Sequence, residues 1–176
     1  MSASHREYIK KVCLLGDGGV GKTSLVRRFV FSEFQDKYLE TIGAKVTKKV
    51  LQVKRRDNEP VKLTMMIHDI AGQVRFESVH CLYYQGAAGA LIVCDLTRNE
   101  TLLDVRSWVE SLRAAAGEVP VILLANKADL ADRHEFGEDA IDKITTRMGA
   151  PFYLTSAKTG QNVEDAFQEM GRRVCE

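Results

Sequence analysis

"GDGGVGKTS" (residues 16–24) lies between an apolar run, residues 8–15, and a series of apolar residues at helical spacing that follows it. It fits the spacing G-x-x-x-x-G-K-[ST], with the fixed positions at Gly16, Gly21, Lys22 and Thr23. Glycines let the backbone curl so that successive N–H groups converge on a phosphate, and a following helix directs its partial positive charge to the same place.

We therefore predict a phosphate-binding loop that comprises Gly16, Gly18, Gly19, Val20, Gly21, Lys22, Thr23 and Ser24. Lys22 is expected to place a positive charge between the β- and γ-phosphates, and the Thr23 hydroxyl to coordinate Mg²⁺. The alternative is a glycine-rich turn with an exposed lysine. The loop alone does not choose between ATP and GTP, or between a kinase and a hydrolase.

The rest of the chain predicts an α/β fold. Strand-like runs cover residues 8–15, 44–53, 61–67, 90–95, 119–125 and 152–155, and helical patterns lie between most of them. Several runs are almost continuously apolar, which is typical of strands covered on both faces. The link between the second and third runs is too short for a crossover helix, so that pair is expected to be antiparallel. We predict three layers: a six-stranded, mostly parallel sheet with one antiparallel edge strand and helices on both faces.

Three details of the helices can be predicted from local patterns. The apolar series Leu102, Val105, Val109 and Leu112 predicts one continuous helix. Gly149 is expected to end the next helix, and Asn162 to cap the start of the last one.

Length and composition limit the class of protein. The chain has 176 residues, of which 45 % are apolar and 28 % charged. These values predict a single domain over residues 1–176. The formal net charge of +1 argues against nucleic-acid binding. No apolar run approaches the roughly 18 residues of a membrane span, and the N-terminus does not resemble a secretory signal. The four cysteines have no metal-ligand spacing, and Cys13 and Cys94 lie inside apolar strand runs, where we expect small core residues in a reducing, cytoplasmic compartment.

Two further motifs point to guanine. "NKAD" (residues 126–129) follows a buried strand, and a carboxylate at Asp129 can accept the adjacent N1–H and N2–H₂ donors of guanine, a pair that adenine does not offer. Asn126 can tie loops together, and the Lys127 stem can lie along one face of the base. "SAK" follows the last strand and can supply a backbone N–H to guanine O6 and a lysine to the other face, from Ser156, Ala157 and Lys158. Taken alone, "NKAD" could be an ordinary polar loop.

The ordered set "GDGGVGKT", Thr41, "DIAGQ" (residues 69–73), "NKAD" and "SAK" resembles the Ras-superfamily small GTPases over residues 8–174. Within that superfamily the chain is most similar to the Rab group, as "YLETIG", "RFESV", "YYQGA" and "CDLT" indicate. The resemblance implies a switch that binds GTP or GDP with Mg²⁺ and slowly hydrolyses GTP to GDP and phosphate. It also implies an exchange factor, a GTPase-activating protein and effectors, with a role in vesicle trafficking or signalling.

The resemblance assigns roles to individual residues. Thr23, Thr41 and Asp69 would hold Mg²⁺, Asp69 through a water molecule. Hydrolysis would use Lys22, Thr41, the Gly72 N–H on the γ-phosphate, and Gln73, which orients the attacking water. The segments around Thr41 and Gly72 would be ordered only while the γ-phosphate is present. Phe34, by position, would stack on guanine, or else is a core aromatic. Tyr38 is also expected at the nucleotide.

Several positions depart from the Rab pattern. His68 and Val46 stand where Rabs carry aromatics that face effectors, while Tyr83 keeps the third aromatic, and Ile70 and Val74 make the second switch more apolar. We expect His68 to be a surface histidine with an ordinary titration. The predicted second strand and the link after it carry a series of basic residues: Lys45, Lys48, Lys49, Lys54, Arg55 and Arg56. We expect these side chains to protect an exposed sheet edge from mispairing; the alternative is a binding surface for an acidic partner or for anionic lipid headgroups.

Two other functions are compatible with parts of the sequence. One is a guanine-nucleotide-binding interaction module impaired in hydrolysis, and the other is a P-loop kinase, in which "NKAD" would have no role. The ending "RRVCE" fits no C-a-a-X pattern. We therefore expect a cytoplasmic protein that is peripheral on a membrane only if a lipidated tail lies outside this chain.

Overall fold

The computed structural model describes residues 6–72 and 77–176. Along the chain its elements are β1 Glu7–Leu15, α1 Lys22–Phe31, β2 Ala44–Lys54, β3 Pro60–Ile70, α2 Glu77–Tyr84, β4 Gly89–Asp95, α3 Asn99–Leu103, α4 Val105–Ala116, β5 Val121–Asn126, the 3₁₀ turn η1 Ala131–Arg133, α5 Glu138–Met148, β6 Phe152–Leu154 and α6 Val163–Val174. Within the described ranges, no helix is both long and apolar enough to cross a bilayer.

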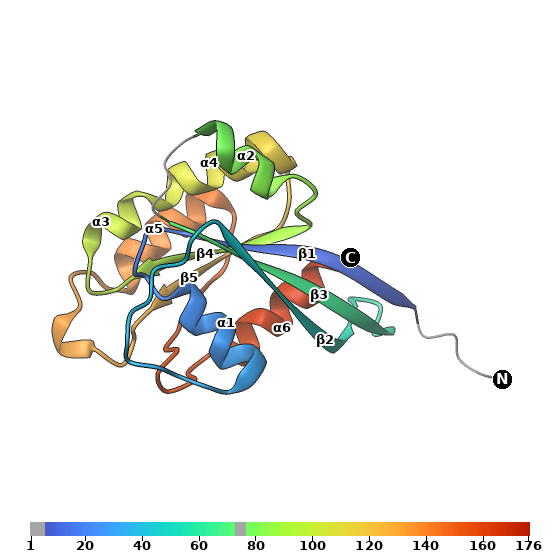
Figure 1. Ribbon diagram of the computed structural model, residues 1–176, viewed down its shortest axis with the longest axis horizontal. Coiled ribbons are helices and arrows are strands. Elements are labelled where there is room, and N and C mark those ends of the chain that lie inside the picture. Colours follow the sequence, from blue (N-terminus) through green and yellow to red (C-terminus); the bar gives the residue numbers. More distant parts are fainter. Residues whose placement is uncertain (1–5, 73–76) are drawn as a thin grey trace.

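The described strands form one six-stranded sheet in the order β2-β3-β1-β4-β5-β6 (Figure 1). The β2–β3 pair is antiparallel and the other neighbours are parallel, which confirms the predicted fold class. Parallel neighbours require crossovers, and helices supply them. Each predicted strand is confirmed, with ends that differ by at most three residues.

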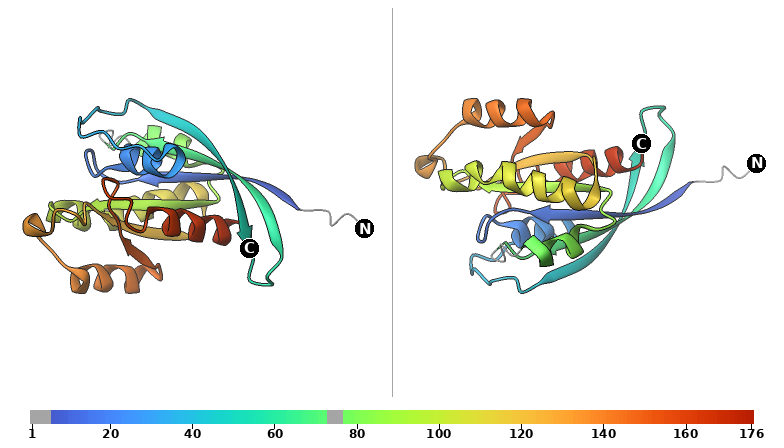
Figure 2. Two further views of the ribbon diagram at one scale, coloured as in Figure 1. Left: turned by 90° about the horizontal axis from the view of Figure 1, so that it is seen from below. Right: turned by 90° about the horizontal axis from the view of Figure 1, so that it is seen from above.

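Helices cover both faces of the sheet, so the fold has three layers (Figure 2). α1 and α6 pack on one face, where they share a buried cluster with Val12 and Leu14 of β1. Helices α2, α4 and α5 pack on the other face, against Cys13 and Leu15. Alternate residues of one strand thus enter opposite cores, because side chains in a strand point to opposite faces.

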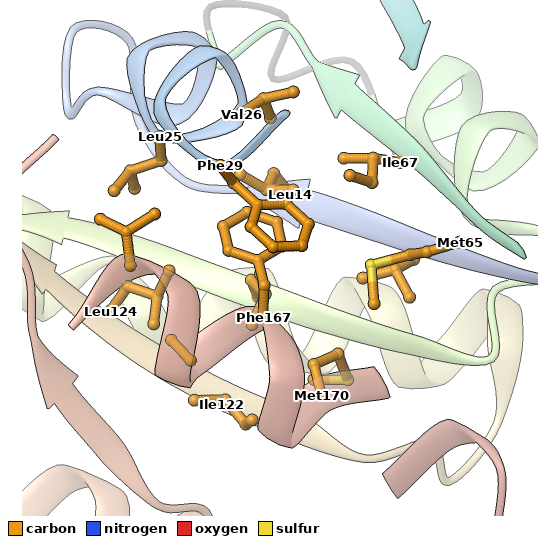
Figure 3. Packing of buried hydrophobic residues seen from close by; sticks show 14 of the residues in the cluster. Leu14, Leu25, Val26, Phe29, Met65, Ile67, Ile122, Leu124, Phe167 and Met170 are labelled. Carbon is orange, nitrogen blue, oxygen red and sulfur yellow. The ribbon is translucent and has the colours of Figure 1, made fainter. Parts of the chain in front are cut away.

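The α1–α6 core holds the loop before α1 in place. The rings of Phe29 and Phe167 stack with centroids 4.2 Å apart and planes 12° apart (Figure 3). Both side chains are buried, and they join α1 to α6 directly. Because Lys22 begins α1, this contact also fixes the direction in which the start of the helix points.

Two helix predictions need correction. The series Leu102 to Leu112 is divided between α3 and α4, with Asp104 at φ −77° and ψ −13° between them. The four apolar residues are buried as expected, because the short break keeps the same face toward the sheet. Asn162 lies at the N-cap of α6 in the left-handed region but does not cap it with its side chain; its amide donates to the Leu154 carbonyl instead. Gly149 ends α5 at φ 64°, as predicted.

The basic residues of positions 45–56 lie on an edge strand and its hairpin, the location assumed when we interpreted them as protection of a sheet edge. β2 is an outer strand of the sheet, and the hairpin that follows it carries Arg55 and Arg56. Arg55 lies 3.4 Å from a Glu59 carboxylate oxygen, and Arg56 lies 2.6 Å from Glu176. Figure 2 shows the C-terminus beside this hairpin. These acidic partners offset part of the positive charge.

Candidate nucleotide site

A pocket of about 310 Å³ opens beyond the carboxyl ends of the central strands, where ligands bind in open α/β sheets. It brings together fifteen of the predicted residues: Gly18, Gly19, Gly21, Lys22, Thr23, Ser24, Phe34, Tyr38, Thr41, Gly72, Asn126, Lys127, Asp129, Ala157 and Lys158. Gly16, Val20, Asp69 and Ser156 lie directly behind this lining and contact it. Gln73 and Val74 fall outside the described residues.

The phosphate loop wraps around Lys22. Its Nζ donates to the carbonyls of Gly16 at 2.8 Å and of Asp17 at 2.9 Å, and the residue is 6 % exposed. Burial lowers the pKa of Lys22 to about 8, against the opposing pull of the nearby Asp69 and Asp17 carboxylates. An ammonium group held in this way is available to an anion that enters the pocket.

Gly21 leaves room for the side chain of Asn126 beside the phosphate loop. Its φ is 105°, and a Cβ there would lie 2.3 Å from Nδ2 of Asn126. That amide donates to the Val20 carbonyl at 3.0 Å, while the Asn126 Oδ1 accepts from Thr155 at 3.1 Å. Asn126 therefore ties the phosphate loop to the loop after β6, as the sequence predicted.

Three oxygen-bearing side chains from separate motifs meet beside Lys22. The Thr23 hydroxyl donates to Oδ2 of Asp69 at 2.5 Å and lies 2.7 Å from the Thr41 hydroxyl. Oδ1 of Asp69 is buried and has no hydrogen-bond partner within residues 6–72 and 77–176. Burial raises the pKa of this carboxyl, and the hydrogen bond from Thr23 and the charge of Lys22 act against that rise.

This oxygen set fits Mg²⁺. Hard divalent cations prefer oxygen ligands, and a cation would satisfy the orphaned Asp69 oxygen. Within the described residues no group of three or more His, Cys, Asp or Glu side chains could hold a metal ion, so carboxylate clustering alone would have missed the site.

At the other end of the pocket, Asp129 is oriented by Ser156. The buried Ser156 hydroxyl donates to Oδ1 of Asp129 at 2.7 Å. The Lys127 stem lines the pocket, and its Nζ pairs with Asp95 at 2.6 Å, a contact that was not predicted. Phe34 lines the pocket and also packs, partly buried, against the α1–α6 core, so its packing in the core leaves it placed where a base could contact it.

Gly72 lies directly against the phosphate loop. A Cβ on this residue would stand 2.4 Å from the Gly16 carbonyl and 2.5 Å from the backbone nitrogen of Gly18. Only glycine can approach that backbone so closely. Tyr38 lines the pocket, with 62 % of its surface exposed.

Several residues that hold the site together were missed in the sequence. Arg28 donates from Nε to the Ala157 carbonyl at 2.7 Å and from Nη2 to the Lys158 carbonyl at 2.6 Å. Trp108 donates to Asp17 at 3.0 Å. These partners are at least 91 positions apart in the chain, and no local pattern marks such pairs.

Comparison with known proteins identifies the family. The sequence matches the Ras family over residues 11–176. The chain belongs to the Ras family. It is 34 % identical to Ras-related protein Rab-13 of Bos taurus over 170 residues, which cover 96 % of this chain and 81 % of Rab-13. It is 34 % identical to Ras-related protein Rab-27B of Homo sapiens (97 % and 81 % covered) and 37 % identical to Ras-related protein RIC1 of Oryza sativa subsp. japonica (96 % and 81 % covered).

The protein is accordingly a Rab-like small GTPase, a nucleotide-dependent switch that binds GTP and GDP with Mg²⁺ and hydrolyses GTP. These relatives do not favour the interaction module impaired in hydrolysis, and they identify a GTP hydrolase rather than a kinase.

Two of the departures from the Rab pattern lie together on this Rab-like GTPase. Val46 and His68 are register partners across β2 and β3, and Val46 is 49 % exposed. Partial burial lowers the pKa of His68, and the charge of Lys11 lowers it further. The expectation of an ordinary titration is therefore wrong, because partial burial, and to a smaller extent the charge of Lys11, disfavours the protonated ring.

Proposed function

We propose that residues 1–176 form a single G domain, with its core over residues 8–174, and that the nucleotide lies along the pocket with its phosphates on residues 16–24. Guanine lies at Asp129, which accepts from N1–H and N2–H₂, with Phe34 and Lys158 against the base. One observation carries this proposal: the Ser156–Asp129 pair and the Thr23–Thr41–Asp69 oxygen set, which come from separate motifs, adjoin one and the same pocket.

For hydrolysis we propose Lys22, Thr41, Gly72 and Gln73 as the reacting set. Lys22 binds the β- and γ-phosphate oxygens, Thr41 and Gly72 hold the γ-phosphate through their N–H groups, and Gln73 orients the attacking water. Thr23, Thr41 and, through a water molecule, Asp69 would hold Mg²⁺, which would neutralise charge on the phosphate oxygens. The close approach of Gly72 to residues 16–18 supports this assignment, because it brings the second switch next to the phosphate loop.

The same residues define a switch. Thr41 and Gly72 reach the γ-phosphate from two segments that GTP orders and GDP releases, so partners that read these segments distinguish the two states. We propose an exchange factor, a GTPase-activating protein and effectors as those partners, and vesicle trafficking as the setting. The chain is proposed to be cytoplasmic, and peripheral on a membrane where a lipidated tail is attached.

Two measurements test these roles. Nucleotide released by heat from the purified protein should be GDP or GTP, and unlabelled ATP should not compete with labelled GTP. In single turnovers the wild type should release phosphate slowly, and Gln73→Leu should slow release at least about tenfold without changing GTP affinity. ATP in the pocket would contradict the base assignment. Unchanged phosphate release in Gln73→Leu would contradict the role of Gln73 alone.

A further inference from the structure

Arg98 extends from a tightly constrained turn after β4 toward the phosphate loop. Its N–H donates to the Asp95 carbonyl at 2.9 Å. Its own carbonyl accepts from the N–H of Thr101 at 3.1 Å and from the Thr101 hydroxyl at 2.7 Å. Thr101 is 1 % exposed. The backbone that presents the Arg98 side chain is therefore held from both sides.

The Arg98 guanidinium joins two groups that are distant in sequence. Nη2 donates to the Gly18 carbonyl at 2.7 Å, and Nε lies 3.2 Å from Oδ2 of Asp95. Asp95 is 0 % exposed, whereas the Arg98 side chain is 36 % exposed. The buried carboxylate of Asp95 thus anchors the Arg98 guanidinium, which at its other end binds the phosphate loop at Gly18.

The contact with Gly18 constrains the neighbouring amide. A peptide unit is planar and trans, so the Gly18 carbonyl and the Gly19 N–H point in opposite directions. A Cβ on Gly19 would lie 3.5 Å from Nη2 of Arg98, so the guanidinium covers the outer side of this peptide. Gly19 has φ 76° and lines the pocket, and its glycine backbone leaves the peptide free to rotate unless it is held.

We propose that Arg98 is a positioning residue of the nucleotide site: anchored on Asp95, it holds the Gly18–Gly19 peptide with the Gly19 N–H directed at the β-phosphate. A charged donor on the carbonyl also polarises the peptide, which makes the Gly19 N–H a better donor. The inference rests on the proposed function, because it requires the phosphates to lie on residues 16–24.

Asp95 extends this arrangement to the base. The same Oδ2 that anchors Arg98 also lies 2.6 Å from Nζ of Lys127, whose stem lines the base end of the pocket. The other oxygen of Asp95 accepts from the Thr97 N–H at 2.8 Å and from its hydroxyl at 2.7 Å. One buried carboxylate thus holds a residue at each end of the nucleotide.

A simpler role for Arg98 would be to neutralise Asp95. The two roles differ in what they do to ligands. A neutralising arginine stabilises the fold and affects every nucleotide alike. A positioning arginine affects only ligands that carry a β-phosphate, so it must distinguish GDP from GMP.

The experiment measures dissociation constants for GDP and GMP, by competition with a fluorescent GDP, in the wild type, Arg98→Ala and Arg98→Lys. The matched control is Arg106→Ala, which removes an exposed arginine of α4 that pairs with Glu110. Arg98→Ala should weaken GDP binding about tenfold, as expected for one charged hydrogen bond, and leave GMP binding within about twofold. The GDP affinity of Arg98→Lys should lie between those of the wild type and Arg98→Ala, because a lysine ammonium cannot bind Asp95 and the Gly18 carbonyl at once as the guanidinium does. Arg106→Ala should change neither.

Each outcome has one meaning. Equal losses for GDP and GMP, or no loss for either in a wild type that prefers GDP, would overturn the role of Arg98. A wild type that binds GDP and GMP equally would overturn the phosphate assignment itself. A drop of tenfold or more in single-turnover hydrolysis by Arg98→Ala, with unchanged GDP affinity, would make Arg98 part of the reacting set and would overturn the positioning role. If Arg98→Ala does not fold, Arg98→Lys decides between the two roles.

Discussion

The hydroxyl of Ser156 donates to Oδ1 of Asp129 at 2.7 Å, and Asp129 lines the base end of the pocket. The two residues lie 27 positions apart and belong to different loops. Ser156 therefore determines which way the carboxylate points. This orientation matters for the proposed binding mode, in which both acceptor sites of Asp129 face the N1–H and N2–H₂ donors of guanine.

Exchange of one carboxylate oxygen for an amide should change the preferred base. In Asp129→Asn the side chain offers one acceptor and one donor, which suits xanthine, where a carbonyl replaces the 2-amino group. GTP affinity should fall by about 100-fold or more, and XTP affinity should exceed it. Competition binding with GTP, XTP and ATP measures this. The control is Asp132→Asn, at an exposed position three residues along. Equal losses for GTP and XTP would argue against a direct contact between Asp129 and the base.

Removal of the metal should loosen the nucleotide. In the proposed site the cation would join the phosphates to Thr23 and Asp69, so EDTA should accelerate GDP release by at least about tenfold. In Asp69→Asn, GDP release should already be fast and should respond little to EDTA. Release of a fluorescent GDP with and without Mg²⁺ measures both effects. Asp57→Asn, at the exposed tip of the β2–β3 hairpin, should behave as the wild type. An undiminished EDTA response in Asp69→Asn would place the cation elsewhere.

The stacked pair Phe29–Phe167 should dominate the stability of the α1–α6 core. Phe167→Ala removes a fully buried ring and leaves a cavity, so the free energy of unfolding should drop by about 3–5 kcal/mol. Phe31→Ala removes a 55 % exposed ring from the end of α1 and should cost no more than about 0.5 kcal/mol. Urea denaturation of the GDP-bound protein checks both. Similar losses in the two variants would show that stacking against α6 adds little.

The buried Asp95 should make stability depend on pH in the acid range. Burial by itself raises the pKa of Asp95, but the hydrogen bonds from Lys127 and Thr97 outweigh it, so the pKa lies below its ordinary value of 3.8. The carboxylate form is thus favoured by folding. The stabilisation that the ionised Asp95 adds to the free energy of unfolding is therefore complete above pH 3.8, and it is lost as the pH falls through the lowered pKa of the folded protein.

Asp95→Asn should therefore be destabilised near neutral pH by about 2 kcal/mol, less than for a fully buried pair because both cations reach solvent. The difference from the wild type should shrink as the pH falls below 3.8. Unfolding by urea between pH 7 and pH 3, in saturating GDP, measures it, with the exposed Asp142→Asn as control. A difference that stays constant with pH would mean that Asp95 is not ionised in the folded protein.

Local sequence patterns determined much of this protein. The alternation of strand and helix patterns, the short link at residues 54–60 and the glycines of residues 16–21 were enough to predict the sheet, its antiparallel edge and the phosphate loop. The reason is that strand period, turn chemistry and loop composition act between residues that are close in the chain. "NKAD" and "SAK" similarly indicated a base site, because each motif carries its chemistry within a few residues.

The tertiary structure alone decided how these motifs are held. Arg28 on the "SAK" carbonyls, Trp108 on Asp17, and Arg98 on Gly18 join segments that become neighbours only when the layers pack. The buried Asp95 looks in the sequence like any acid at the end of a strand, and its two partners, Arg98 and Lys127, are identified only by their positions in space. Such contacts depend on the geometry of the packed sheet and helices, and no spacing along the chain encodes that geometry.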